Sequence, residues 1–260
     1  AGAAVATVIG QIIAAILALV FNLKCNRELN ISMKGFRPNG HLIVQIYKVG
    51  APSIVVQAIG SLMTYGMNLI LAAFGSAQTV FGIYFKLQSF VFMPVFGLNN
   101  GMVPIIAYNY GAGHKDRVIK TIKHSVAYGV GIMFAGLLAM HIFPAQLMRM
   151  FDAEESLIAI GAPALETISL SFVFAGFCIV AGSVFQALGN GVYSMIVSVA
   201  RQMCVLLPVA KLLSLSGEVT LIWWAFPIAE LASVLLTSYF LVRIYRKVIC
   251  HIGEPVVQDA

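Results

Sequence analysis

Six polar residues lie within long apolar stretches of the chain, where they could hold a charged or polar solute. They are Gln57, Asn68, Gln88, Asn99, Asn100 and Glu230. A carboxylate inside a membrane can bind a cation or a proton, and amide side chains can line a polar pathway. Each group can instead form a structural hydrogen bond to a neighbouring helix. The residues leave both interpretations open, and a cavity lined by these groups is the functional hypothesis.

The positions of these groups in the sequence predict which helix face, or which end of a span, their side chains occupy. Gln57 and Asn68 are eleven residues apart, which is about three turns of a helix, so they fall on nearly the same face. Arg201 follows a short turn by only a few helical turns, and we expect its side chain to extend to the membrane surface. Glu166 lies near the end of its apolar segment, where we expect it to be solvated.

Residues 93–113 form the most irregular apolar segment of the sequence. Its helix-perturbing residues are Pro94, Gly97, Gly101, Pro104 and Gly111. Proline removes a backbone donor, so a helix in lipid carries it only where neighbouring groups satisfy the freed carbonyl. Two interpretations follow: a kinked packing helix with Gly97 and Gly101 on its contact face, or the wall of a solute pathway.

Composition identifies an all-α polytopic membrane protein. Of 260 residues, 60% are hydrophobic and 10% are charged, against about 25% charged in soluble domains. The mean hydropathy is +0.93. Seven apolar segments are predicted to span the membrane: Ala3–Phe21, Val49–Phe74, Val80–Tyr108, Ser125–Phe143, Pro163–Leu188, Tyr193–Leu213 and Thr220–Val242.

The distribution of charge predicts the orientation of these spans. Lys and Arg follow the first, third and seventh spans, whereas Asp and Glu follow the fourth. Basic loops face the cytoplasm, so we expect a cytoplasmic C-terminus and an external N-terminus with further helices before it. The net charge of +6 therefore indicates membrane orientation and not nucleic-acid binding. The four scattered cysteines and the lack of hydrolase or nucleotide-binding motifs predict no metal site, no catalytic residues and no enzyme.

The sequence of residues 97–113, followed by Arg117-Val, resembles the eighth-helix signature of the multidrug and toxic compound extrusion (MATE) transporters. Further segments resemble other helices of that family in the same order. These are residues 2–11 for the sixth helix, 50–53 and 75–78 for the seventh and its turn, 186–190 for the tenth and 223–230 for the twelfth. The similarity covers nearly the whole chain and is greatest to the bacterial DinF/MepA-like branch.

This resemblance implies a twelve-helix fold built from two six-helix bundles. Residues 1–23 would be the last helix of the first bundle, 24–47 a basic cytoplasmic linker, 48–247 the second bundle and 248–260 a cytoplasmic tail. It also implies export of amphipathic, often cationic compounds from the bacterial inner membrane by alternating access. Inward Na⁺ or H⁺ would drive export, with no organic cofactor, and the first bundle would be the partner.

Two features depart from the family pattern. The family's first-helix Asp lies outside this chain. The segment that resembles the family's seventh helix carries Gln57 and Asn68, where some members carry a carboxylate. Two alternatives therefore stay open. One is a lipid-linked oligosaccharide flippase of the same superfamily, although few intramembrane cations are present to bind a pyrophosphate. The other is a truncated helical bundle that does not transport.

Overall fold

The computed structural model describes residues 2–25, 37 and 39–253, which form two units, Ala1–Ile46 and Tyr47–Ala260. The first unit holds α1 (Gly2–Cys25) and the beginning of α2. Described side chains along α1 are almost all exposed, and most are apolar. An apolar helix that exposes its side chains all round suits contact with lipid, which solvates such a surface where water does not.

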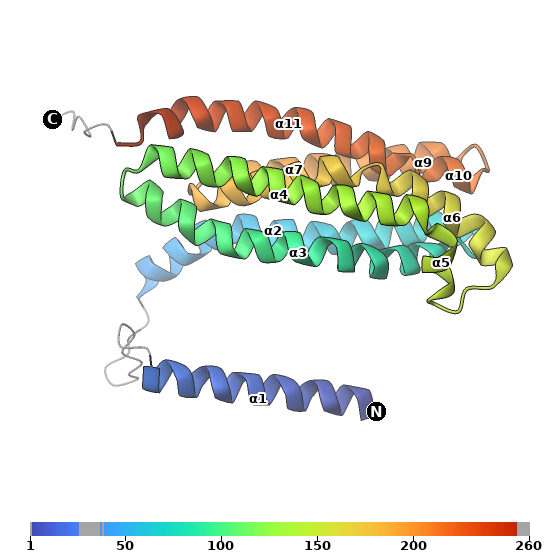
Figure 1. Cartoon of the computed structure of the whole chain (residues 1–260), viewed down its shortest axis with the longest axis horizontal. Helices are drawn as coiled ribbons and strands as arrows, with labels where there is room; N and C mark the ends of the chain where they lie inside the picture. The colour runs from blue at the N-terminus through green and yellow to red at the C-terminus, as the bar shows by residue number, and fades with distance from the viewer. Residues whose placement is uncertain (1, 26–36, 38, 254–260) are drawn as a thin grey trace. The chain divides into compact units, whose positions relative to one another are not determined.

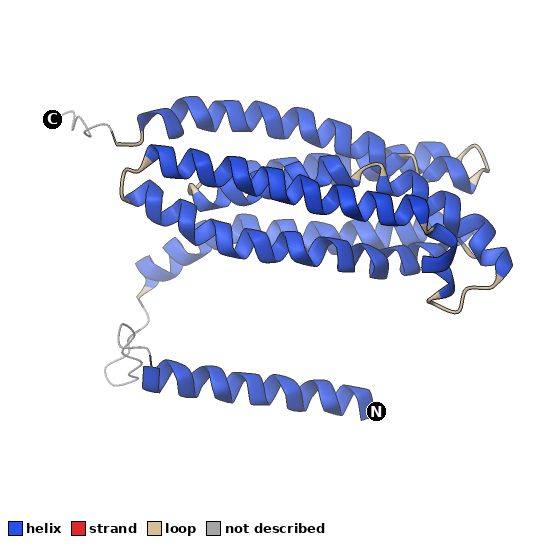
Figure 2. Ribbon diagram, viewed as in Figure 1, coloured by secondary structure: helices blue, strands red, loops and turns tan. Residues whose placement is uncertain are grey.

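Helices make up the second unit (Figures 1 and 2). The longer ones are α2 (Gly40–Leu71), α3 (Ala77–Gly111), α4 (Lys115–Ile142), α6 (Glu155–Ser169), α7 (Phe172–Ala187) and α11 (Ala225–Lys247). The shorter ones are η1 (Ala72–Phe74), α5 (Pro144–Arg149), α8 (Gly191–Val199), η2 (Ala200–Leu206), α9 (Leu207–Ser214), α10 (Val219–Ile222) and η3 (Ile249–His251).

The prediction of seven membrane spans is confirmed. In the described part of the chain, six helical segments are long and apolar enough to cross a membrane, and the bent pair α6–α7 supplies the seventh. All backbone groups in hydrocarbon must be satisfied within the chain, and helices do this internally. The chain is therefore an all-α polytopic membrane protein.

Two predicted boundaries differ from the structure. Residues 40–47, assigned to the linker, are the beginning of α2, and residues 115–124, assigned to a loop, are the beginning of α4. Polar residues there reach the interface from a helix, so their presence does not mark a loop. Linker residues 26–36 and 38 and tail residues 254–260 lie outside the described residues.

The predicted single helix Pro163–Leu188 is instead two helices. They begin at Glu155 and meet at a bend of 49° between α6 and α7. Hydroxyl groups explain the break: Ser169 Oγ donates to the Glu166 carbonyl at 2.9 Å, and Ser171 Oγ donates to the Ile168 carbonyl at 2.6 Å. Such side chains offer the backbone alternative partners and bend helices.

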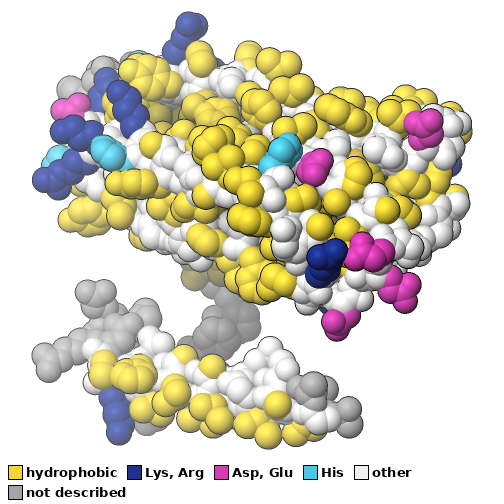
Figure 3. All heavy atoms as spheres, turned by 45° about the vertical axis from the view of Figure 1, so that its right-hand side comes forward, with side chains coloured by type: hydrophobic (Ala, Val, Ile, Leu, Met, Phe, Trp, Pro, Cys, Tyr) yellow, Lys and Arg dark blue, Asp and Glu magenta, His cyan; other side chains and the backbone are white. Residues whose placement is uncertain are grey.

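Charged groups gather at the two ends of the second unit, with an apolar band between them. Figure 3 shows most Lys and Arg side chains at one end and most Asp and Glu side chains at the other. The basic end includes the beginning of α4 and the end of α11, and the acidic end includes the loop between α5 and α6. This arrangement fits the orientation expected from the sequence, which stays a prediction.

Glycines allow close contact between α4 and α7 in the core. An added Cβ atom at Gly176 would lie 3.1 Å from the carbonyl oxygen of Gly129 and 2.9 Å from Met133 Cγ. Met133 is fully buried, as is Val180 on the facing helix. Small residues at helix contacts let backbones approach and gain dispersion energy, which drives association in lipid.

Substituting Gly176 tests this contact. We expect Gly176→Val to lower the free energy of unfolding by about 1–3 kcal/mol, because the new side chain overpacks against a backbone carbonyl. Thermal unfolding of the purified protein in detergent measures the loss. Gly131→Val is the matched control, since a Cβ atom at that position of α4 meets nothing within 4 Å. Equal losses in the two variants would show that close approach at Gly176 is not stabilising.

Candidate functional site

A cavity of about 770 Å³ lies within the second unit. Helices α2, α3, α7, α8 and α11 line it together with η2. Its amide and hydroxyl lining includes Ser53, Gln57, Ser61, Thr64, Gln88, Ser89, Asn99, Asn100, Ser183, Gln186, Ser194, Ser198 and Gln202. The volume falls in the range of about 300–1,000 Å³ that holds drug-sized molecules. Its neutral donors and acceptors can bond many different polar groups.

Aromatic residues are among the apolar residues that line the cavity. Tyr84 and Phe226 lie with ring centroids 5.8 Å apart, and Phe92 and Phe96 lie 6.4 Å apart. All four residues line the cavity. Aromatic faces pack against flat solutes and attract cations. The cavity thus combines apolar rings with polar groups, as amphipathic solutes require.

An ion pair between Arg201 and Glu230 joins η2 to α11 across the cavity lining. Arg201 Nη1 donates to Glu230 Oε1. Glu230 is buried, and its side chain is 8% exposed against 28% for Arg201. Opposite charges within a membrane protein pair because an isolated charge there is costly. Of the described residues that line the cavity, these two carry a formal charge.

The turn that carries Arg201 is a π-helix. The backbone N–H of Leu207 donates to the carbonyl of Gln202, five residues earlier. Pro208 follows, and its ring would collide with a carbonyl four residues before it in an ordinary α-helix. The wider turn relieves that crowding, and π turns are frequent at functional sites. Adjacent residues Arg201 and Gln202 both line the cavity here.

Two buried oxygen atoms in the cavity lining, Glu230 Oε2 and Asn99 Oδ1, have no protein partner in the described structure. Buried polar atoms of this kind cost free energy unless they bond something. Glu230 and Ser233 are three residues apart on α11 and so lie on one face. Their oxygens are of the type that holds a proton or a hard monovalent cation. Among the described residues, no cluster of three or more His, Cys, Asp or Glu is placed to bind a metal ion.

Comparison with known proteins identifies the family. The MatE family model matches residues 52–212, which covers most of the second unit and includes most of the residues that line the cavity. The chain belongs to the MatE family.

Curated MatE relatives are similar over nearly the whole chain. Multidrug export protein MepA of Staphylococcus haemolyticus (strain JCSC1435) is 26% identical over 248 residues, 95% of this chain and 54% of that protein. MepA of Staphylococcus aureus (strain N315) is 27% identical over 231 residues, 88% of this chain and 51% of that protein. The chain therefore spans about half the length of the curated relatives it matches.

Solved MatE structures share the fold. The MATE multidrug transporter DinF-BH, solved with a bound ligand, is 33% identical, with a TM-score of 0.82 over 95% of this chain and 56% of that chain. An outward-facing MATE family transporter of the MOP superfamily is 20% identical, with a TM-score of 0.83 over 94% of this chain and 56% of that one. The expected resemblance to half of a MATE fold is confirmed.

Most of the polar residues singled out in the sequence meet in the cavity of this MatE bundle. Gln57, Gln88, Asn99, Asn100 and Glu230 line it. Their roles in transport stay predictions.

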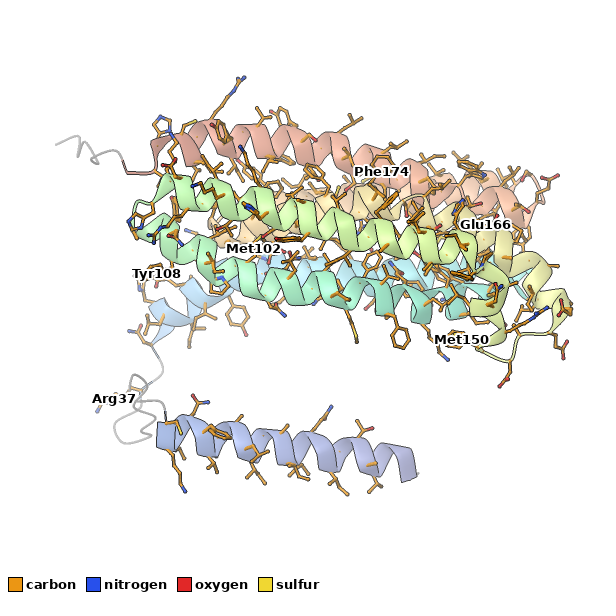
Figure 4. The ribbon with its side chains drawn as sticks, viewed as in Figure 1. Arg37, Met102, Tyr108, Met150, Glu166 and Phe174 are labelled. Carbon is orange, nitrogen blue, oxygen red and sulfur yellow. The ribbon has the colours of Figure 1, made fainter. Side chains whose placement is uncertain are left out.

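Asn68 lies outside the cavity lining. Its amide donates to the Thr64 carbonyl of its own helix at 2.9 Å. Glu166 is half-buried on α6, toward the same end of the unit as Met150 (Figure 4).

The proline- and glycine-rich segment forms part of one unbroken helix, α3, that contains both Pro94 and Pro104. Added Cβ atoms at Gly97, Gly101 or Gly111 meet nothing within 4 Å in the described structure, so no helix of this unit packs closely there. Gly97 and Gly101 instead help to line a shallow groove of about 470 Å³ shared with α4. Asn99, on the same helix, lines the main cavity.

Sequence reasoning missed the partner of Glu230. Arg201 was expected to extend to the membrane surface, but it turns to Glu230 inside the bundle. Both charges lie in consecutive apolar spans, and opposite charges in such spans usually pair. That signal was present in the sequence. The π turn that places Arg201 was signalled only by Pro208, which does not specify how the helix adjusts.

A double-mutant cycle tests the ion pair. We expect Arg201→Ala and Glu230→Ala each to destabilise the protein, because each leaves a charge unpaired. The coupling free energy should be about 1–3 kcal/mol, measured by denaturant unfolding. The exposed pair Arg149–Glu155, with atoms 2.9 Å apart and side chains 61% and 79% exposed, is the matched control and should couple by less than about 1 kcal/mol. Equal coupling in the two cycles would contradict the assignment.

Proposed function

We propose that the chain supplies the second bundle of a secondary transporter that exports amphipathic, often cationic compounds across a bacterial inner membrane. The observation that carries this proposal is the cavity of about 770 Å³ inside a MatE bundle. Its aromatic rings suit flat apolar bodies, and its amides and hydroxyls suit varied polar groups. The names of the relatives, multidrug export protein and multidrug transporter, support the same class of substrate.

In this proposal, the second bundle works with a first bundle, and the two rock to expose the cavity to each side in turn. A packed two-state assembly can be biased by any ligand that binds one state better. The separation of basic and acidic groups at opposite ends of the unit (Figure 3) supports a cytoplasmic C-terminus in a multi-pass arrangement.

The coupling ion is proposed to be Na⁺ or H⁺, with Glu230 as its site in this bundle. Support comes from the unpaired Glu230 Oε2 in the cavity lining. Neutralising or solvating that carboxylate changes its attraction for Arg201, and thereby gives an ion a way to alter helix packing. An ion that favours one packing of the bundle over the other drives the transport cycle.

The two alternatives receive less support. A flippase for a pyrophosphate-linked substrate needs an excess of positive charge, but Arg201 is matched by Glu230. A purely structural bundle does not require a polar cavity, because apolar packing is less costly in a membrane protein's core. The arrangement therefore favours transport of drug-like compounds.

Efflux measurements test the proposal. In bacterial cells depleted of their own pumps, the protein as its source expresses it should expel preloaded ethidium. A protonophore or replacement of Na⁺ should abolish the expulsion, and which treatment does so identifies the ion. Efflux that continues after both gradients collapse would exclude secondary transport, and no efflux of any cationic dye would exclude this substrate class.

A matched pair of substitutions connects efflux to the cavity. We expect Gln88→Leu to reduce the initial efflux rate by about 2–10-fold, because one hydrogen-bonding group of the lining is lost. Gln146→Leu makes the same chemical change at an exposed position of α5, away from the cavity, and should leave efflux unchanged. Membrane content of both variants is compared by immunoblot. Equal effects of the two substitutions on the efflux rate would show that the cavity lining does not determine transport.

A further inference from the structure

The ion pair in the cavity is asymmetric in its exposure. The Arg201 side chain is 28% exposed, whereas that of Glu230 is 8% exposed. The carboxylate is therefore the more deeply buried partner, and the guanidinium is the more accessible one. A solute that enters the cavity meets the positive member of the pair first. An organic cation that approached Glu230 would also approach the guanidinium bonded to it, which repels like charge.

The guanidinium has unused hydrogen-bonding capacity. Arginine carries five N–H donors in a planar fork, and the described structure records one bond, from Nη1 to Glu230 Oε1. A planar fork with free donors matches the two oxygens of a carboxylate, which it binds through parallel hydrogen bonds. Lysine, as a compact charge, does not offer this geometry.

The charge balance of the cavity limits which solutes can supply the carboxylate that Arg201 binds. Arg201 and Glu230 neutralise each other, and the described lining carries no other formal charge. A solute with a lone carboxylate would leave a net negative charge in a poorly solvated space, which is costly. A solute that also carries a cation keeps the site neutral. Its cation can lie over the exposed ring of Phe96, which lines the same cavity.

We propose that Arg201 recognises the carboxylate of zwitterionic amphiphiles in this cavity, with Glu230 balancing the charge of the guanidinium. The inference rests on the proposed export function and specifies a substrate class for it. The same geometry makes Arg201 a specificity-determining residue, because it attracts a carboxylate and repels a purely cationic group. Solutes in which the acid is masked lose that interaction.

Two dyes that differ at one group test this assignment. Rhodamine B carries a free carboxylate beside its cationic ring system, and its ethyl ester carries the cation alone. Binding of each dye to the purified protein, as its source expresses it, is measured by fluorescence polarisation in detergent. We expect the wild-type protein to bind both dyes, with tighter binding of the acid. Arg201→Gln should weaken binding of the acid by about tenfold or more and change binding of the ester by less than about twofold.

Two further variants keep the test decisive if Arg201→Gln does not fold. Arg201→Lys retains the charge without the fork, so the acid should bind with intermediate affinity. Glu230→Gln keeps the volume of the side chain and releases Arg201 from its partner, so it should strengthen binding of the acid relative to the ester. Size-exclusion chromatography and thermal unfolding identify the variants that are folded.

The outcomes separate this inference from the export proposal. Equal losses for both dyes in Arg201→Gln would assign Arg201 a structural role and overturn the inference. Wild-type protein that binds the ester more tightly than the acid would overturn it too, while leaving export of cationic compounds in place. Wild-type protein that binds neither dye would overturn both. A preference for the acid that disappears in Arg201→Gln and increases in Glu230→Gln would establish the site.

Discussion

The architecture depends on one constraint, that each backbone donor and acceptor in hydrocarbon must find a partner inside the protein. Long helices satisfy it, and the irregular points of the bundle show how it is met elsewhere. At the α6–α7 bend, the hydroxyls of Ser169 and Ser171 bond carbonyls of the preceding turn. At η2, a wider turn accommodates Pro208. Ser171 and Gln202, one from each irregular point, line the cavity. Both irregular points therefore contribute residues to the polar cavity.

Much of the fold follows from the sequence because the dominant signal is simple. Apolar segments of membrane-spanning length are hard to mistake, so all seven spans were predicted. The α6–α7 bend was not, because residues 169–172 continue the apolar pattern with serines that are tolerated in a straight helix. Whether a serine bonds its own backbone or another helix depends on tertiary packing. The beginnings of α2 and α4 were predicted too late in the chain, because charged residues can begin a helix at the membrane surface as readily as they form a loop.

Residue spacing in the sequence does not by itself identify which residues line the candidate site. Gln57 and Asn68 were placed on one helical face, but Gln57 lines the cavity and Asn68 bonds its own helix. Spacing gives the angle of a side chain around the helix and not how far along the axis the cavity extends. Arg201 was interpreted from its distance to the end of its span, whereas its environment is set by α11. A pairing between helices requires knowledge of which spans are neighbours, and this is the information that the three-dimensional arrangement adds.

Stability does not explain why a MatE bundle keeps an arginine and a glutamate in this cavity. Desolvating two ions is costly, and well-packed apolar residues of the same volume often give a more stable protein. The pair here is also incompletely bonded, since Glu230 Oε2 has no protein partner in the described structure. A neutral pair within an aromatic and hydroxyl-rich cavity provides local charges for recognition without giving the empty cavity a net charge. In the proposed function, an ion or a solute that weakens either charge would also alter the contact between η2 and α11.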